Sequence, residues 1–304
     1  MLSQDLDRYI ALQRASGLKF TTQNGLLRSF VAFAEAAGDD RVRSSRVLDW
    51  AARTTSAMQA RTRLLIVRRF AEALAIEDPV HEVPPADAFG RWKFERQMPY
   101  IYSAKEIAAL MVAARHLGPP GSIRPETMAT LIGLLAATGL RVSEALALDM
   151  GDITADGLVI RETKFRKNRL VPLHSSTRAA LDRYMQRRRK IKGAGNTLFV
   201  GDKGRRPAYV TLCVLFRRLG WEAGLRDLPG ENGPRMHDLR HTFAVRSLEA
   251  CNGDRRAIAR HMLALATYMG HSDPSHTWWY LQATPTLMRN IAEAGEALHA
   301  GGDA

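Results

Sequence analysis

The chain has 304 residues, 46% of them hydrophobic, which is enough to bury the core of one large domain or of two ordinary ones. Its apolar runs are far shorter than a membrane span and its N-terminus carries acids where a signal peptide would be apolar, so we expect a folded cytoplasmic protein without a membrane anchor. Forty-four basic and 31 acidic residues give a net charge of +13, which favours a polyanionic partner, with nucleic acid as the first candidate.

The basic excess is unevenly distributed along the chain. Residues 1–85 carry 12 basic and 10 acidic side chains, whereas residues 86–304 carry 32 and 21. A solvated surface can also carry such an excess, so charge alone does not identify a nucleic-acid-binding protein. The two cysteines, Cys213 and Cys251, stand apart without CxxC spacing, which argues against a disulfide framework and against a thiolate metal site.

The first part of the chain is predicted to be a small helical domain. Apolar residues recur every three or four positions from Leu2 to about Ala75, and short polar or glycine-containing breaks divide this stretch into about four helices. The stretch from Glu77 to Pro99 has four prolines and mixed charge without a period, as an extended linker would. We therefore place a helical domain at residues 1–85, a linker at 86–100 and a second domain at 101–304.

The second domain is predicted to begin with a capped helix. Ser103 and Glu106 have the spacing of a capping box, in which both side chains satisfy free amide groups at a helix start. Residues 126–148 follow a helical pattern that Gly139 should break or bend. Residues 157–164 and 169–174 alternate well enough for two strands joined by the polar turn 165–168, which predicts a β-hairpin.

Helical patterns return after the hairpin and continue through the rest of the chain. They cover residues 177–192, 211–224, 238–251 and 255–269, and a glycine-rich loop at 193–204 interrupts them. The sequence therefore predicts a mainly α fold with a small antiparallel β-sheet.

Four segments carry the residues that can do chemistry. They are ATGLRVSEALAL at 137–148, ETKFRKNRLVPL at 162–173, HDLRHTFA at 237–244 and MGHSDPSHTWWYL at 269–281. Their order, spacing and residue types resemble those of the tyrosine recombinases, the phage-integrase-like enzymes, from about Ser103 to the C-terminus. The N-terminal segment resembles the core-binding domain of that family only in size, position and helicity.

The resemblance implies a fold and an activity. It implies a SAM-like core-binding domain that binds DNA at residues 1–85 and a catalytic integrase domain at residues 101–304. The expected activity is site-specific recombination of double-stranded DNA through a 3′-phosphotyrosyl intermediate, in integration, excision or transposition. The expected assembly is a tetramer of this chain on synapsed DNA, with other recombinases as possible further partners.

No cofactor is implied by this chemistry. The phosphotyrosine preserves the phosphodiester bond that a 5′ hydroxyl later restores, so neither ATP nor a metal ion is needed. The sequence also contains no P-loop and no acidic cluster of the kind that two-metal nucleases use.

The family motifs assign phosphate ligands to the first and third segments. Arg141 matches the first catalytic arginine, and Glu144 its neighbouring acidic support. His237 and Arg240 match the HxxR pair, whose members project from one helix face and can grip one phosphate. Planar guanidinium groups suit this role because each holds two non-bridging oxygens of a phosphoryl group, which a lysine cannot.

The hairpin segment is expected to supply the general acid. Lys164 lies seven residues before Val171, where the family carries its catalytic lysine, and we assign it to protonate the leaving 5′ oxygen. Arg166 and Lys167 are rivals for this role. Together with Arg169 they are otherwise expected to contact the DNA backbone.

The last segment is expected to supply the nucleophile. His271 matches the family histidine that binds the phosphate, and Tyr280 follows nine residues later, at the family spacing for the attacking tyrosine. A phenol has a pKa near 10 and needs surrounding cations and a base to attack phosphorus at neutral pH. An amphipathic tail at residues 286–298 follows, and in the family such a tail packs on a neighbouring subunit.

Three other functions stay open at this point. His237, His241 and His271 could hold the metal of a hydrolase, although Arg240 would place a fixed positive charge beside it and the glutamate of an HExxH motif is absent. A DNA-binding relative without activity would have the same fold. A type IB topoisomerase would share the phosphotyrosine mechanism and would relax DNA without exchanging strands.

Overall fold

The computed structural model describes residues 1–90, 98–161, 168–228, 233–251 and 255–270. The chain forms two compact units, Met1–Arg96 and Gln97–Ala304. In the described part, no helix is both long and apolar enough to cross a membrane.

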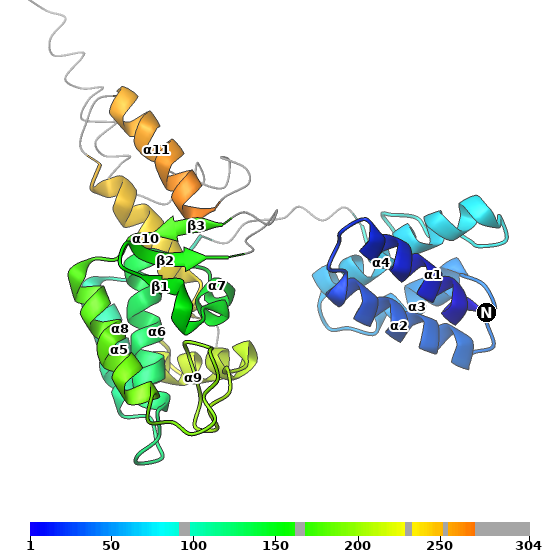
Figure 1. Cartoon of the computed structure of the whole chain (residues 1–304). Coiled ribbons are helices and arrows are strands. Elements are labelled where there is room, and N and C mark those ends of the chain that lie inside the picture. The colour runs from blue at the N-terminus through cyan, green and yellow to red at the C-terminus, as the bar shows by residue number, and fades with distance from the viewer. Residues whose placement is uncertain (91–97, 162–167, 229–232, 252–254, 271–304) are drawn as a thin grey trace, which may run out of the picture. The chain divides into compact units, whose positions relative to one another are not determined.

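The first unit consists of four helices (Figure 1): α1 (Leu2–Ala15), α2 (Thr21–Ala36), α3 (Ser44–Ala52) and α4 (Ala57–Glu77). Each helix buries residues at three-and-four spacing, which gives the unit its own core, with Leu6, Phe30 and Phe70 among its members. The longest helix, α4, begins where the Ser56 side chain accepts a hydrogen bond from the amide of Gln59. About four helices were predicted here, and four are present in the described part of this unit.

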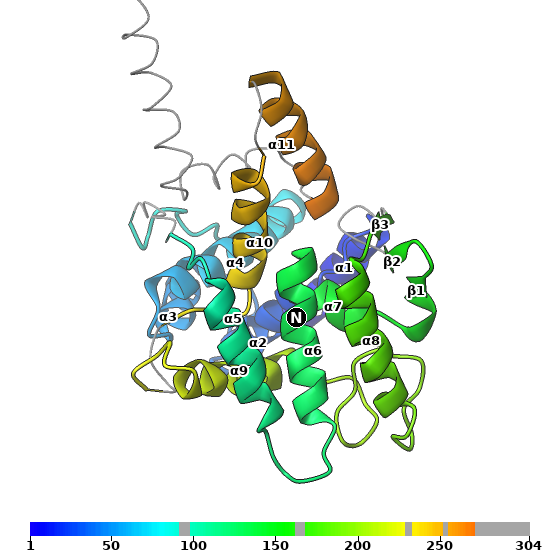
Figure 2. The same ribbon diagram turned by 90° about the vertical axis from the view of Figure 1, so that its left-hand side faces the viewer.

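The helices of the second unit are arranged around α6 (Arg124–Thr138), which packs between α5 (Ala104–Arg115) and α8 (Ser175–Arg188) and also contacts α10 (Asp238–Glu249) (Figure 1, Figure 2). Helix α6 is buried on most of its circumference, as befits a helix inside a core. The other helices are α7 (Val142–Ala147), α9 (Tyr209–Glu222), α11 (Arg255–Met269) and the 3₁₀ turn η1 (Met150–Asp152).

A three-stranded antiparallel sheet lies in the same unit, with β1 (Ile153–Thr154), β2 (Gly157–Ile160) and β3 (Arg169–Val171) in sequence order. In the pairing of β2 with β3, Leu158 lies opposite Val171 and Ile160 lies opposite Arg169. The prediction of two antiparallel strands is confirmed for these residues. Strand β1 was missed because two residues are too few to show an alternating pattern.

Two local predictions for the second unit are also confirmed. The capping box at the start of α5 is formed, with Ser103 accepting from the amide of Glu106 and Glu106 accepting from the amide of Ser103. The helical pattern of 126–148 is divided at Gly139, where α6 ends in the left-handed conformation before α7 begins.

Candidate active site

The position of Arg141 is set by the turn between α6 and α7. Gly139 has a φ of 61°, and a Cβ atom at this position would lie 2.5 Å from the Cδ1 atom of Phe243 on α10. Only glycine allows the end of α6 to approach α10 so closely. Arg141 follows as the residue before α7, and its backbone amide donates a 3.0 Å hydrogen bond to Oε2 of Glu144 in the first turn of that helix.

Glu144 stands between two arginines. Its Oε1 atom accepts from Nη1 of Arg141 at 2.7 Å and from Nη1 of Arg169 at 3.1 Å, while its Oε2 atom accepts from Nη2 of Arg169 at 2.8 Å. Burial of the carboxyl group opposes ionisation, but the hydrogen bonds and charges of Arg169 and Arg141 outweigh it and lower the pKa of Glu144 to about 2. Glu144 is therefore a carboxylate at neutral pH.

Arg240 joins the ends of two helices at the same place. Its guanidinium donates 2.6 Å hydrogen bonds to the carbonyl of Gly139, at the end of α6, and to the carbonyl of Met269, at the end of α11. The carbonyl of Gly270, one residue further, accepts from Nη2 of Arg141 at 3.1 Å. We call Arg141, Glu144, Arg169 and Arg240 the arginine cluster; it sets three positive charges against one negative charge.

The arginine cluster differs in exposure from one member to the next. Arg240 is 2% exposed, and the side chains of Glu144 and Arg169 are 10% and 13% exposed. The side chain of Arg141 is 31% exposed, which makes it the most accessible member of the cluster. A positively charged, partly desolvated site of this kind attracts an anion and binds it more strongly than a fully hydrated charge would.

His237 stands beside the cluster at the start of α10, three residues before Arg240. Part of the ring is open to solvent, but the protein around it and then the positive charges of Arg240, Arg235 and Arg141 lower the pKa of His237 below 6.5, against the opposing charge of Asp238. The imidazole is therefore neutral at pH 7 and can accept a proton. His241, one turn further along α10, is buried. Its ring packs edge-on against the ring of His237, with 4.8 Å between the two ring centroids.

The structure brings together three of the predicted catalytic residues, Arg141, His237 and Arg240, with the supporting Glu144, at the junction of α6, α7, α10 and α11. The other catalytic predictions, Lys164, His271 and Tyr280, lie outside the described residues, as do Arg166 and Lys167. Gly270, directly before His271, has a φ of 64°, and a Cβ atom there would lie 2.9 Å from Nη1 of Arg169. The chain thus approaches His271 through a glycine turn packed on the arginine cluster.

The metallohydrolase alternative requires three ligands in one place. Among the described residues, no group of three His, Cys, Asp or Glu side chains is placed to hold a metal ion. His237 and His241 lie side by side, but His271, the third ligand of the metallohydrolase alternative, lies outside the described residues.

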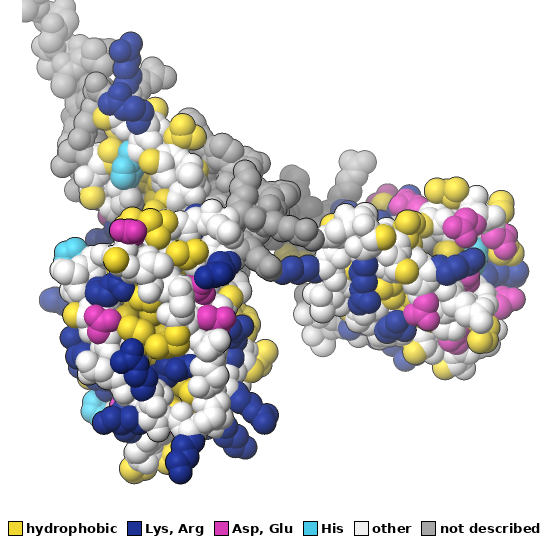
Figure 3. Space-filling view, viewed as in Figure 1, with side chains coloured by type: hydrophobic (Ala, Val, Ile, Leu, Met, Phe, Trp, Pro, Cys, Tyr) yellow, Lys and Arg dark blue, Asp and Glu magenta, His cyan; other side chains and the backbone are white. Residues whose placement is uncertain are grey.

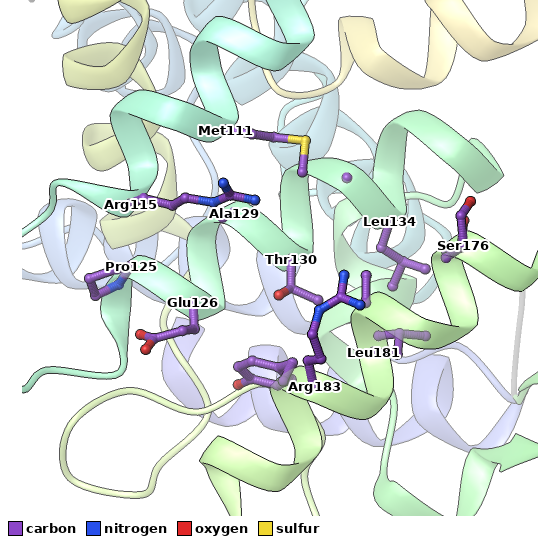
Figure 4. A pocket seen from close by; sticks show the side chains of 14 residues that line it. Met111, Arg115, Pro125, Glu126, Ala129, Thr130, Leu134, Ser176, Leu181 and Arg183 are labelled. Atoms are coloured by element: carbon purple, nitrogen blue, oxygen red, sulfur yellow. The ribbon is translucent and has the colours of Figure 1, made fainter.

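The arginine cluster is separate from a groove of about 540 Å³ between α5, α6 and α8. Figure 4 shows Arg115 of α5 and Arg183 of α8 among the side chains that line this groove, with Leu134 of α6 and Leu181 of α8 beside Arg183. No residue that lines the groove belongs to the cluster. Basic side chains also surround hydrophobic ones on the face of the second unit seen in Figure 3.

Sequence reasoning missed the part that Arg169 takes in the site. It was expected to contact DNA because it follows the basic turn of the hairpin, but its guanidinium lies on Glu144, 25 residues away in the chain. No spacing rule links a strand residue to a helix residue at that separation. The glycines at 139 and 270 gave a better signal, because each precedes a motif residue by one or two positions.

Comparison with known proteins agrees with the motifs. Residues 101–286 match the model of the phage integrase family. A putative integrase/recombinase of Sinorhizobium fredii is 36% identical over 297 residues, which cover 94% of each chain. The tyrosine recombinase XerC of Actinobacillus pleuropneumoniae is 29% identical over 238 residues, 78% of this chain and 71% of XerC.

The fold is also that of a solved recombinase. The lambda integrase in its tetramer bound to a Holliday junction superposes with a TM-score of 0.62 at 17% identity, covering 92% of this chain and 76% of the integrase. This likeness and the family match confirm the predicted mainly α fold with a small antiparallel sheet. The chain therefore belongs to the phage integrase family and is a tyrosine recombinase, a site-specific recombinase that breaks and rejoins DNA.

Proposed function

We propose that the arginine cluster and His237 hold the scissile phosphate of a DNA strand while Tyr280 attacks it. The observation that supports this most directly is the surplus of positive charge around Arg141, the most exposed guanidinium of the cluster. A phosphoryl group gains charge on its non-bridging oxygens as it reacts, and fixed guanidinium groups stabilise that charge without reorganising.

The bonding changes of the first step are as follows. The phenolic oxygen of Tyr280 bonds to phosphorus, the bond between phosphorus and the 5′ oxygen breaks, and the strand is left attached through its 3′ phosphate. Lys164 donates a proton to the leaving 5′ oxygen, and the phenolic proton passes toward His237, whose lowered pKa leaves it neutral and able to accept it at pH 7. His271 is a further ligand of the phosphate. Attack by a 5′ hydroxyl reverses these changes and rejoins the strand.

The proposal also covers DNA binding by the first domain and the assembly of the chain. The helical domain at residues 1–85, within the first unit, acts as the DNA-binding core-binding domain, and the chain assembles on duplex DNA as a tetramer, as the solved lambda integrase does on its junction. The net charge of +13 favours DNA binding through release of counterions. The proposed location is the cytoplasm, because the substrate is duplex DNA.

Covalent trapping tests the proposal. Wild-type protein, Tyr280→Phe and Tyr100→Phe are incubated with fragmented genomic DNA, denatured, and the DNA that stays attached to protein is sequenced. Tyr100 is the matched control, since its hydroxyl bonds Glu106 at the start of the second unit. We expect specific fragments held by their 3′ ends for the wild type and for Tyr100→Phe, and none for Tyr280→Phe.

Each other outcome points to a different function. If no variant is linked although all bind DNA, the proposed cleavage is wrong and a DNA-binding role takes its place. If linked strands are relaxed but never exchanged between duplexes, the activity is that of a type IB topoisomerase. If a metal chelator abolishes the linking, the reaction requires a metal ion, and His237, His241 and His271 become its candidate ligands.

A further inference from the structure

Arg169 is turned inward from the edge of the sheet. It is the first residue of β3 and pairs with Ile160 of β2, yet its guanidinium reaches α7 and uses one nitrogen for each oxygen of Glu144. Its side chain is 13% exposed and its Nε atom is shielded from solvent. A side chain in this position is poorly placed to follow a DNA backbone, which needs an exposed cation.

The bidentate contact fixes the carboxylate that orients Arg141. Both arginines donate to Oε1 of Glu144. The bonds from Arg141, one from its backbone amide and one from its guanidinium, come from the same helical turn as Glu144. The two bonds from Arg169 come from a different element, so they hold the plane of the carboxylate against the frame of the sheet.

Arg169 also sets the charge that Arg141 can offer. A single pair of Arg141 with Glu144 would be neutral, whereas two arginines on one carboxylate leave a net positive charge. Nη1 of Arg169 lies against Gly270, at 2.9 Å from where a Cβ atom would stand, and the carbonyl of Gly270 accepts from Arg141. Arg169 therefore touches both the carboxylate and the turn that position Arg141.

We infer that Arg169 is a positioning residue for strand cleavage, which holds Glu144 and the Gly270 turn so that Arg141 presents its guanidinium to the scissile phosphate. This inference rests on the proposed function. It assigns Arg169 no contact with DNA, in place of the DNA contact expected from the sequence.

The test compares cleavage with binding on a fragment that the wild type captures. Single-turnover formation of the covalent complex and the equilibrium affinity for the same duplex, over a series of salt concentrations, are measured for wild type, Arg169→Lys and Arg169→Ala. Arg161→Ala is the matched control, because Arg161 directly follows β2, has a side chain that is 64% exposed, and pairs with Asp152 at 2.5 Å. Thermal unfolding of each variant shows whether it is folded.

We expect Arg169→Lys to cleave about 10–100-fold more slowly, because a point charge cannot hold both carboxylate oxygens and small displacements of a phosphate ligand are costly. Its DNA affinity should stay within about threefold of wild type with an unchanged salt slope, whereas loss of a phosphate contact lowers that slope by about one. Millimolar guanidinium chloride, but not potassium chloride, should restore cleavage by Arg169→Ala. Arg161→Ala should cleave at the wild-type rate.

Two results would overturn the inference while the proposed function stands. One is wild-type cleavage by a folded Arg169→Lys; the other is a loss of cleavage that follows a loss of affinity and a shallower salt slope, which would make Arg169 a DNA contact. If the wild type itself forms no Tyr280-dependent complex, the proposed function fails and the inference fails with it.

Discussion

At the scale of single residues, the site depends on guanidinium groups that serve two partners at once. Nη1 of Arg141 donates a hydrogen bond to the carboxylate of Glu144, and Nη2 donates one to the carbonyl of Gly270. Each of these nitrogens carries a second hydrogen, so Arg141 can be fixed by the protein and still bind a phosphate oxygen. A lysine carries its three N–H donors on one nitrogen, so it cannot bond the carboxylate and the carbonyl from two separate nitrogens while it presents a planar pair of donors to a phosphate.

Arg141→Lys should therefore cleave DNA about 10²–10³-fold more slowly than wild type, the range seen when one preorganised donor is removed from a reacting oxyanion. Single-turnover formation of the covalent complex measures the change. Arg115→Lys, in the groove between α5, α6 and α8, is the matched control and should react like wild type. Equal rates for Arg141→Lys and wild type would remove Arg141 from the phosphate site.

Glu144→Gln should change stability in a way that depends on pH. A carboxyl group whose pKa is lowered by folding stabilises the fold when ionised, so the contribution of Glu144 is complete above 4.5 and is lost as the pH falls toward 2. At pH 7 we expect the free energy of unfolding of the variant to be about 3 kcal/mol lower than that of wild type, because Arg169 and Arg141 lose their shared charged partner.

Urea denaturation of both proteins between pH 7 and pH 2 measures this effect. The two stabilities should converge as the pH falls below 4.5. Curves that stay parallel over the whole range would show that the carboxylate of Glu144 is not held by its arginines in solution.

At the scale of elements, the turn between α6 and α7 decides where the arginine cluster lies. Gly139 ends α6, and its carbonyl accepts a hydrogen bond from Arg240. Because Gly139 has no Cβ atom, the ring of Phe243 can approach the backbone closely. The same residue thus sets the direction of α7, which carries Glu144, and binds the arginine of α10. Gly139 therefore contributes both to the packing of α6 on α10 and to the geometry of the arginine cluster.

Gly139→Ala should lower the free energy of unfolding by about 1–3 kcal/mol, because alanine is strained at a φ of 61° and its Cβ atom would overlap the ring of Phe243. Gly25→Ala is the control with the opposite sign: Gly25 lies inside α2 with open space around it, so alanine should stabilise that helix by about 0.5–1 kcal/mol. Urea denaturation measures both. Equal effects of the two substitutions would contradict the strain at Gly139.

At the scale of the whole molecule, the chain has a separate core in each unit. The buried cluster of the first unit is drawn from residues 2–74, and those of the second unit are drawn from residues 102–269. No buried residue of the described chain belongs to clusters in both units. Each unit can therefore be expected to unfold as its own cooperative body.

Substitutions in the two cores should accordingly act on different unfolding transitions. Phe30→Ala should destabilise the first unit by about 3–5 kcal/mol, and Leu131→Ala should destabilise the second by about 2–5 kcal/mol. Scanning calorimetry, with hydrogen exchange to assign each transition, measures the shifts. One transition that moves as a whole in both variants would show that the two units unfold together.

The sequence by itself determined most of the helices, the strands β2 and β3, and the motif residues. Helix periodicity, the capping box at Ser103 and the break at Gly139 act over a few neighbouring positions, so they can be read from a short window. The helix at Arg255–Met269 was predicted with the bounds that the structure gives it. The family motifs named Arg141, His237 and Arg240 because their order along the chain is distinctive.

Only the tertiary structure decided how these residues meet. Arg169 reaches Glu144 across 25 residues and Arg240 reaches Gly139 across 101, and no local pattern fixes such distances. They depend on how α6, α7, α10 and α11 pack, which two glycines at positions 139 and 270 make possible by allowing close approach. The sequence therefore predicted Arg141 and Arg240 as cations of the site, whereas packing decided that Arg169 joins them and that Arg141 is the most exposed of the three.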